Sequence, residues 1–190
     1  IKAVLTDGNH AVKATGTHGW ENRYEDGYWT YPLESVWDGM RAAFGELLEN
    51  YHRRYRKRLQ GVQCMCISGM MHGYLPFDRA GKQLTAFRTW RNTTTAEASE
   101  ILSERLGMNI PQRWSAAHLY QAVLNGEAHV REIGYINTLA GYVHRELSGR
   151  FTVGSGEASG MFPLEAGGGA YDEKKAEIYE ELLAEKGIVL

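Results

Sequence analysis

The order of hydrophobic and polar positions predicts extended and helical segments in alternation. Residues 2–7 and 11–17 are both strand-like, and a tight turn at 8–10 joins them, so this pair is typical of a β-hairpin. Residues 28–32 form an aromatic, extended approach to a helix that we predict over 33–58. The chain is therefore expected to begin with a hairpin and one long helix.

The long helix and the segment after it carry the main hydrophobic signals. Apolar side chains recur along the helix every three or four positions, which predicts one buried stripe made of Trp37, Met40, Phe44, Leu47, Leu48, Tyr51 and Tyr55. The run over 62–68 is nearly all apolar and has the length of a strand. Such a run is expected for a central strand covered on both faces, so we predict a buried strand there.

The second half of the chain predicts further helices and another strand. Helices are expected over 93–106, over 115–124 with Ser115 as the N-cap, and over 139–147 with Gly149 as the stop. A last helix should begin after Asp172, with Ile178, Tyr179, Leu182 and Leu183 facing inward. A short strand is expected over 133–138, and a glycine-rich loop with a short strand over 154–164. No repeat or low-complexity tract divides the sequence. The length allows one α/β domain, or one domain and the start of another, and we predict a single domain over residues 1–190.

Composition narrows the function classes. The 190 residues are 43% hydrophobic, which suffices for a packed core, and the formal net charge of −2 argues against a dedicated nucleic-acid binder. Cys64 and Cys66 lie two apart in a strand-like run, so they fit neither a disulfide framework nor a metal knuckle and favour a reduced, cytoplasmic setting. No run approaches about eighteen apolar residues and no signal peptide precedes the fold, so we expect neither a membrane protein nor a secreted one.

Two short motifs carry the candidate chemistry. In residues 67–74, with the sequence I-S-G-M-M-H-G-Y, an apolar segment runs into a glycine-flanked turn that carries a thioether and an imidazole. A short hairpin then leads to Trp90, Arg91 and Asn92. A turn of this kind, together with a second loop that bears an aromatic ring and polar side chains, is suited to holding a small polyol.

The order of these motifs resembles the sugar-binding half of the FGGY carbohydrate kinases, most closely their xylulokinase-like members. Residues 156–162, G-E-A-S-G-M-F, are similar to the D-A-S-G segment of that family, and residues 1–7 are similar to its second strand alone. The resemblance implies an α/β fold of the ribonuclease-H-like (actin/hexokinase) type, with a mixed sheet flanked by helices. It also implies that the first strand, the ATPase half and the general base lie outside this chain, the base after Leu190.

By the same resemblance, the complete protein is expected to transfer the γ-phosphoryl group of ATP, with Mg²⁺, to a free sugar, first of all a ketopentose such as xylulose. This chain alone is expected to be inactive, because it would supply no catalytic residue and no metal ligand. Its substrate-binding residues would be Met71, His72, Trp90, Arg91 and Asn92. Met71 and His72 would present an apolar surface and a hydrogen-bonding tip, Trp90 a flat face for the C–H side of the sugar, and Arg91 or Asn92 a bond to its hydroxyls. The expected partner is a small sugar, with a homodimer left open, and neither nucleic acid nor membrane is expected to bind.

Each candidate residue has a structural alternative. A histidine after a buried strand is often bonded to a backbone carbonyl, and Met71 or Trp90 alone would be interpreted as core residues. The flanking glycines and the presence of both motifs favour the ligand role for His72. Glu157 is better explained as a structural acid that ties loops together than as a catalytic group. His118 either faces the pocket or occupies an ordinary half-exposed helix position, and the second interpretation is favoured.

Departures from the family pattern leave the substrate and the function class partly open. Met70 stands where many xylulokinases have glutamine, and Trp90-Arg91-Asn92 replaces the commoner Trp-Asn-Asp, so a kinase is better supported than any one sugar. One alternative is a sugar-binding sensor of the same fold that does not phosphorylate its ligand. Another is a polyanion-binding domain that uses the basic run 53–58, although cations at the end of a helix are already explained by its dipole.

Overall fold

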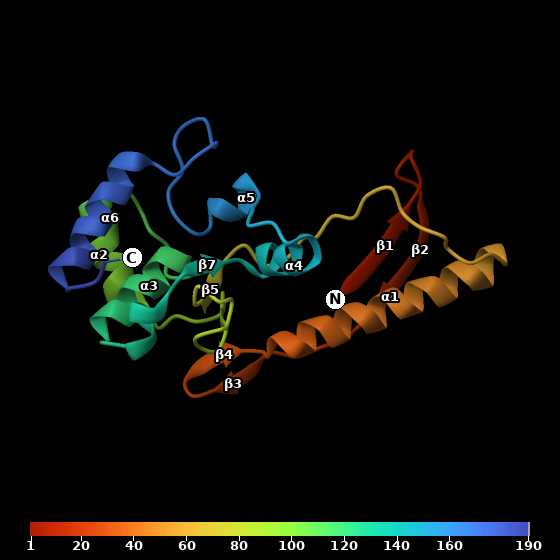
Figure 1. The fold of residues 1–190 in the computed structure, drawn as a ribbon, viewed down its shortest axis with the longest axis horizontal. Helices are drawn as coiled ribbons and strands as arrows, with labels where there is room; N and C mark the ends of the chain where they lie inside the picture. Colours follow the sequence, from red (N-terminus) through yellow and green to blue (C-terminus); the bar gives the residue numbers. More distant parts are fainter. Residues whose placement is uncertain (190) are drawn as a thin grey trace. The chain divides into compact units, whose positions relative to one another are not determined.

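The computed structural model describes residues 1–189 and combines helices with small β-sheets, as expected for an α/β chain (Figure 1). Contacts between residues divide the chain into two compact units. Unit 1 contains residues 1–23 and 31–66, and unit 2 contains residues 24–30 and the chain from residue 67 onward. The expectation that both units belong to one sugar-binding domain stays a prediction.

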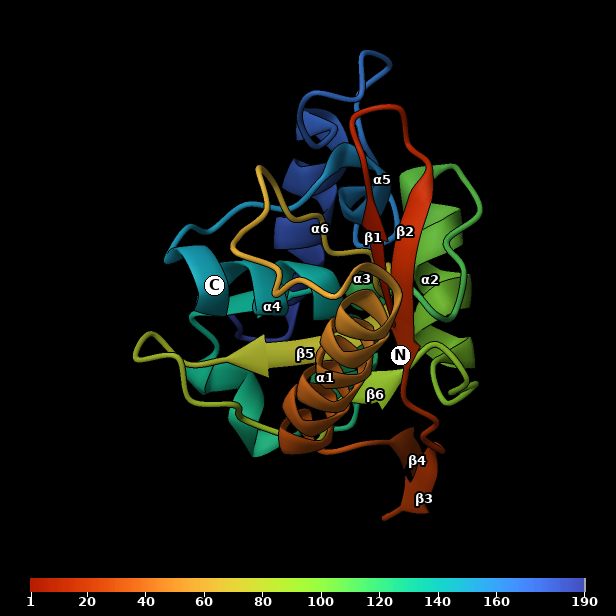
Figure 2. The ribbon, with the colours of Figure 1, turned by 90° about the vertical axis from the view of Figure 1, so that its right-hand side faces the viewer.

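Unit 1 is a β-hairpin with one long helix packed on it. Strand β1 (Lys2–Thr6) pairs antiparallel with β2 (Val12–Thr17), so the predicted hairpin is confirmed. Helix α1 (Leu33–Tyr55) lies against β2 (Figures 1 and 2). Their approach is very close at Gly16, where an added Cβ atom would lie 2.0 Å from the carbonyl oxygen of Ala43. The strand and the helix therefore meet through backbone atoms at this point.

The buried face of α1 consists of smaller residues than the predicted stripe. Its fully buried residues are Leu33, Val36, Gly39, Ala43 and Leu47. Of the predicted stripe, Leu47 alone is fully buried, and Phe44 is 50% exposed. The stripe prediction is wrong because β2 lies so close to the helix that small side chains must fill the contact. The large apolar residues lie at its margins instead.

Helix α1 also ends earlier than predicted, at Tyr55 rather than Arg58. Arg56 adopts a left-handed conformation with φ of 55°, and its N–H donates to the carbonyl oxygen of His52 at 2.8 Å. A left-handed residue with such a bond is a common helix ending. The cations of residues 53–58 consequently lie at or just beyond the C-terminus of α1, where they interact favourably with the helix dipole.

The segment 62–68 is not the buried strand that its apolar composition predicts. It has no regular structure, and most of it is exposed, with Val62 at 53% and Met65 at 63%. A strand requires a neighbouring strand for its backbone hydrogen bonds. The strand pairs found within residues 1–189 do not include this segment. The prediction is therefore wrong, because an apolar run gives no information about whether a pairing partner is present.

Unit 2 is built around strand β5 (Gly73–Phe77), whose five residues are all buried. It lies between β6 (Arg88–Thr89) and β7 (Tyr135–Asn137) and is antiparallel to both. The hairpin predicted to connect the two motifs is thus confirmed. The pairs β1–β2, β5–β6 and β5–β7 are all antiparallel, so these strands do not form the predicted mixed sheet.

Three helices form most of the hydrophobic core of unit 2: α2 (Ala96–Leu106), α3 (Ser115–Leu124) and α6 (Glu173–Glu185). Helix α3 also packs against β5, which connects the core to the strand that leads from the first motif. The predicted cap of α6 is confirmed, since the Asp172 side chain accepts a bond from Lys175 N at 3.1 Å. Ser115 is not the N-cap of α3. It is the first helical residue, and its hydroxyl donates to the carbonyl of Gly73 at 2.7 Å.

Shorter elements complete unit 2: β4 (Tyr28–Thr30), which pairs with β3 (Arg23–Glu25), the 3₁₀-helix η1 (Ala128–Glu132), α4 (Leu139–Ser148) and α5 (Ser155–Ala158). Gly149 ends α4 with φ of 72°, as predicted. The glycine-rich segment expected to contain a strand contains the short helix α5 instead. None of the helices described here is both long and apolar enough to cross a membrane.

The backbone contact at Gly16 predicts an asymmetric response to two alanine substitutions. Gly16→Ala is expected to destabilise unit 1 by about 1–3 kcal/mol or more, because a new methyl group would overlap the Ala43 carbonyl. Gly45→Ala on α1 is the matched control, since no atom lies within 4 Å of its added Cβ, and it should stabilise the helix by roughly 0.5–1 kcal/mol. Urea unfolding of both variants measures the difference. Equal stabilities would contradict the observed packing of β2 on α1.

Candidate functional site

The first predicted loop ends at Gly73, where the chain enters β5. Gly73 has φ of 119°, and a Cβ atom added there would lie 2.5 Å from the carbonyl oxygen of Arg88. Its N–H donates to the carbonyl of Arg113 at 3.0 Å. A side chain at this position is excluded both by the backbone conformation and by the space. The sequence needs glycine here so that Met71 and His72 can stand directly before a buried strand.

The pairing of β5 with β6 brings the two predicted loops to the same end of the sheet. Gly73 is paired with Thr89 in the antiparallel register. His72 precedes Gly73 and Trp90 follows Thr89, so both residues lie at the same end of this strand pair. The position is favourable for the predicted convergence on one ligand, and a direct contact of both side chains with a sugar stays a prediction.

The third motif lies directly against the first. An added Cβ atom at Gly160 would lie 2.5 Å from His72 Nδ1 and 2.7 Å from the carbonyl oxygen of Met71. The same His72 nitrogen is 3.4 Å from the carbonyl oxygen of Gly160. This is the type of bond that the structural interpretation of His72 expects. Binding of a ligand by the other ring nitrogen, Nε2, stays a prediction.

The environment of His72 favours an uncharged imidazole. Its side chain is partly buried, and desolvation lowers its pKa. The bond to Gly160 acts in the opposite direction, and the positive charge of Arg113 lowers the pKa further. A neutral imidazole offers one donor and one acceptor, which suits recognition of sugar hydroxyls.

The second loop separates into exposed and buried members. Trp90 is 50% exposed, so the interpretation of this residue as core is wrong. The Arg91 guanidinium carbon lies 4.8 Å from the ring centre of Trp29 and 5.9 Å from that of Trp90. Both distances are within the range of cation–π interactions. The loop therefore presents an aromatic face with a cation beside it.

Asn92 is the buried member of the second loop, at 3% exposure. Its Oδ1 accepts from Trp29 N at 2.8 Å, and its Nδ2 donates to the carbonyl oxygens of Trp29 and Thr89 at 2.9 and 2.8 Å. Both amide protons are thus used by the backbone. We therefore treat Asn92 as a residue that positions the loop, and its predicted bond to a sugar hydroxyl is untested.

Glu157 in α5 fits the interpretation as a structural acid. It is partly buried, and burial raises its pKa. A hydrogen bond with Thr138 opposes that shift. Thr138 is itself the N-cap of α4 and accepts from Gly141 N at 2.9 Å. Glu157 therefore ties the third motif to the start of α4.

His118 corresponds to neither of its two predicted positions. It is completely buried on α3, and its ring stacks on that of Tyr74 with the centres 6.1 Å apart. Neither ring nitrogen has a hydrogen-bond partner in the described part of the chain. Desolvation, with a smaller effect from the charge of Arg88, lowers the pKa of His118 to about 3. The apolar neighbours of this position on α3 were the available signal of burial.

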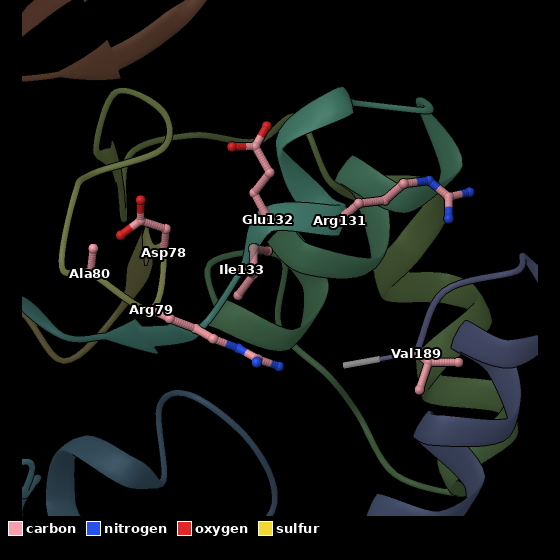
Figure 3. A pocket seen from close by; sticks show the side chains of 7 residues that line it. All are labelled: Asp78, Arg79, Ala80, Arg131, Glu132, Ile133 and Val189. Atoms are coloured by element: carbon pink, nitrogen blue, oxygen red, sulfur yellow. The ribbon is translucent and has the colours of Figure 1, made fainter.

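A cavity of about 420 Å³ lies elsewhere in unit 2 (Figure 3). Its lining residues are Asp78, Arg79, Ala80, Arg131, Glu132, Ile133 and Val189. None of the predicted substrate-binding residues belongs to it. The Asp78 side chain closes a turn, since its Oδ1 accepts from Lys82 N at 2.8 Å. Across residues 1–189, no three His, Cys, Asp or Glu side chains are grouped so that they could hold a metal ion.

The burial of His118 predicts a specific dependence of stability on pH. The unfolded chain binds a proton at this histidine near pH 6.5, whereas the folded chain does so only near its pKa of about 3. The free energy of unfolding should therefore be highest above pH 6.5 and fall as the pH decreases, by about 2 kcal/mol at pH 5. His118→Gln should remove this part of the slope, while His144→Gln on an exposed position should leave it. Chemical denaturation at several pH values checks this, and identical slopes for both variants would contradict it.

Comparison with known proteins relates this geometry to a known fold. No protein-family model and no curated protein matches the sequence. Among solved structures, a xyloylose kinase from Brucella ovis is similar, with a TM-score of 0.76 and 18% identity, over 98% of this chain and 38% of that chain. A gluconate kinase from Lactobacillus acidophilus has a TM-score of 0.76 at 14% identity, over 99% and 43% of the two chains. A xylulose kinase from Rhodospirillum rubrum has a TM-score of 0.69 at 21% identity, over 98% and 39%.

The chain spans 38–43% of the length of these kinases. At sequence identities of 14–21%, the similarity concerns the fold alone. The predicted resemblance to carbohydrate kinases and the predicted α/β fold class are confirmed in that sense, since this chain has the fold of part of a sugar kinase.

Proposed function

We propose that the protein to which this chain belongs transfers the γ-phosphoryl group of ATP to a free sugar, with a ketopentose such as xylulose as the first candidate. In this proposal the chain supplies the sugar-binding half. The observation that carries it is the meeting of the motifs: the β5–β6 register sets the first two loops at one end of a strand pair, and Gly160 of the third lies against His72. Similar folds in chains described as xyloylose, gluconate and xylulose kinases support it.

The described side chains suggest a division of roles. Nε2 of His72 would bond a sugar hydroxyl, and the exposed ring of Trp90 would cover the C–H side of the sugar. Met71 would supply apolar contact, and Arg91 would bond a second hydroxyl. Asn92 would hold the loop in place through its bonds to Trp29. Phosphoryl transfer demands mainly positioning and exclusion of water, so these contacts are what a sugar-binding half needs to contribute.

The sites for ATP and Mg²⁺ belong to the same proposal. No group of three potential ligands is present in residues 1–189, and no side chain of this part is assigned to the metal. We propose that ATP, the metal and the general base are held by residues outside this chain, with the base after Leu190. The chain alone would consequently be inactive.

The remaining expectations belong to the same proposal. The protein would act in the cytoplasm on a small sugar, either as a monomer or as a homodimer, without nucleic acid or membrane as a partner. The basic run 53–58 is the competing observation, because all its cations are exposed. Its position at the end of α1 already accounts for them through the helix dipole. A non-catalytic sugar sensor of the same fold is the second candidate function.

The proposal predicts activity for the full-length protein and none for this chain. A coupled assay of ADP release with Mg·ATP, over a panel of ketoses, aldoses and polyols, should show turnover with the full-length protein and a preference for ketopentoses. The control is the same assay with residues 1–190, which should remain at background. Sugar binding by a full-length protein that releases no ADP would assign the protein to the sensor function instead, and turnover by the chain alone would show that the base lies within it.

The contact between the first and third motifs predicts a second result. Gly160→Ala should lower kcat/KM for the sugar by about 10–100-fold, because the new methyl group must displace His72 or the Met71 backbone. Gly156→Ala in the same segment is the matched control, since nothing lies within 4 Å of its added Cβ. Steady-state kinetics of both variants provide the measurement. If both variants lost kcat/KM to the same extent, the contact of Gly160 with His72 would not contribute to the use of the sugar.

A further inference from the structure

Arg88 is a buried cation directly beside the second loop. It lies in β6, two positions before Trp90, and is 4% exposed. Its Nη1 donates to Glu127 Oε1 at 3.1 Å, and its Nη2 donates to Glu127 Oε2. This two-pronged pairing fixes the plane of the guanidinium as well as its position.

Aromatic rings enclose the same guanidinium. Its central carbon lies 4.2 Å from the ring centre of Tyr28 in β4 and 5.4 Å from that of Tyr74 in β5. Tyr74 is paired with Arg88 in the strand register, so these two side chains share a face of the sheet. The guanidinium is therefore surrounded by residues from β4, β5 and the segment after α3.

Glu127 is held in its ionised form by this environment. Burial raises its pKa, but the hydrogen bond and the charge of Arg88 outweigh that effect, so the net shift is downward. Asn125 Nδ2 also donates to Glu127 Oε1 at 3.3 Å. His129 extends the cluster, with Nδ1 at 3.5 Å from Glu127 Oε2 and Nε2 at 2.9 Å from the hydroxyl of Tyr74. Desolvation lowers the pKa of His129, so a neutral ring can donate to Glu127 and accept from Tyr74.

The cluster is connected to both sides of the candidate sugar site. On one side, Arg88 continues through Thr89 into Trp90. On the other side, Tyr28 precedes Trp29, whose backbone is bonded to Asn92. The guanidinium of Arg88 thus holds the loop and the β3–β4 hairpin in a common position. None of Arg88, Glu127 or Tyr28 belongs to the residues expected to touch the sugar.

An ion pair of this kind is not the simplest way to stabilise a fold. Apolar residues of similar volume avoid the desolvation of two charges, and such replacements are often neutral or stabilising. What an apolar pair lacks is the directional, two-pronged geometry of arginine with a carboxylate. The feature that distinguishes the Arg88–Glu127 pair is therefore the precision with which it orients neighbouring chain segments.

We propose that Arg88 and Glu127 are positioning residues of the sugar site, which orient the loop of Trp90–Asn92 together with the β3–β4 hairpin. The inference rests on the proposed function for its kinetic part only. The orientation of loop and hairpin is a property of the fold and can be measured without a sugar.

The test uses the full-length protein with Arg88→Lys, which keeps the charge and loses the two-pronged bond. The KM for the sugar should rise about tenfold or more, while kcat and the KM for ATP stay within about threefold, because a misplaced loop weakens sugar binding and leaves the phosphoryl donor unaffected. Glu185→Gln is the matched control, since it removes an exposed ion pair with Arg105 in the same unit. That variant should leave all three constants unchanged.

A second variant, with Arg88→Met and Glu127→Leu together, separates positioning from stability. It should unfold at a denaturant concentration equal to or above that of the wild type and still show the raised KM for the sugar. Hydrogen–deuterium exchange gives a readout independent of activity. The amide of Trp29, which donates to Asn92, should exchange at least tenfold faster in both Arg88 variants, with unchanged protection of α3 and α6.

Faster exchange at Trp29 alone, without any sugar phosphorylation by the wild type, would support the positioning role and refute the proposed function. Faster exchange throughout α3 and α6 in both Arg88 variants would show a general loss of stability and overturn the inference. Unchanged exchange and an unchanged KM for the sugar in the double variant would overturn it as well.

Discussion

The close approach of backbones at Gly73 is the constraint on which the arrangement of unit 2 depends. At this residue the chain leaves the first motif, enters β5 and pairs with Thr89. Its N–H and its carbonyl are both used, by Arg113 and by the hydroxyl of Ser115. The start of α3, the end of β6 and the histidine turn are therefore held to one point of the backbone. Polar groups satisfied in this way can be buried without a large desolvation penalty.

In unit 2, the apolar core and the candidate binding residues lie in different parts of the fold. The apolar core lies among α2, α3 and α6, where Leu102, Ile110 and Leu182 are almost completely buried. The loops that leave the β5–β6 end carry exposed or half-buried groups, such as Trp90 and His72. Binding residues are often found on loops that a packed core positions, since loops tolerate functional side chains that a core would exclude.

The sequence predicted those features that depend on local chemistry. The hairpin of residues 2–17, the stop at Gly149 and the cap at Asp172 follow from turn and capping preferences of the residues themselves. The glycine-flanked turn before β5 likewise follows from local conformation. Features that depend on which distant segments contact each other could not be predicted from the sequence.

Two errors, and one set of contacts that was not foreseen, show this dependence on partners. Segment 62–68 is apolar but finds no strand to pair with in the described chain. The stripe on α1 was chosen by size, whereas the proximity of β2 at Gly16 selects small residues. Asn92 also bonds the backbone of Trp29, 63 positions earlier in the chain, and these bonds could not be inferred from the sequence. Neither the composition of the chain nor the spacing of its apolar residues contains such long-range information.

The hairpin of residues 24–30 gives unit 2 a discontinuous sequence. Its flanking residues, 1–23 and 31–66, belong to unit 1, so the chain passes from one unit to the other three times. A continuous stretch that starts at residue 67 would lack both Tyr28 and Trp29. The ring over Arg88 and the backbone partner of Asn92 would then be missing. Any continuous segment of the chain that contains all these contacts therefore also contains residues 31–66 of unit 1.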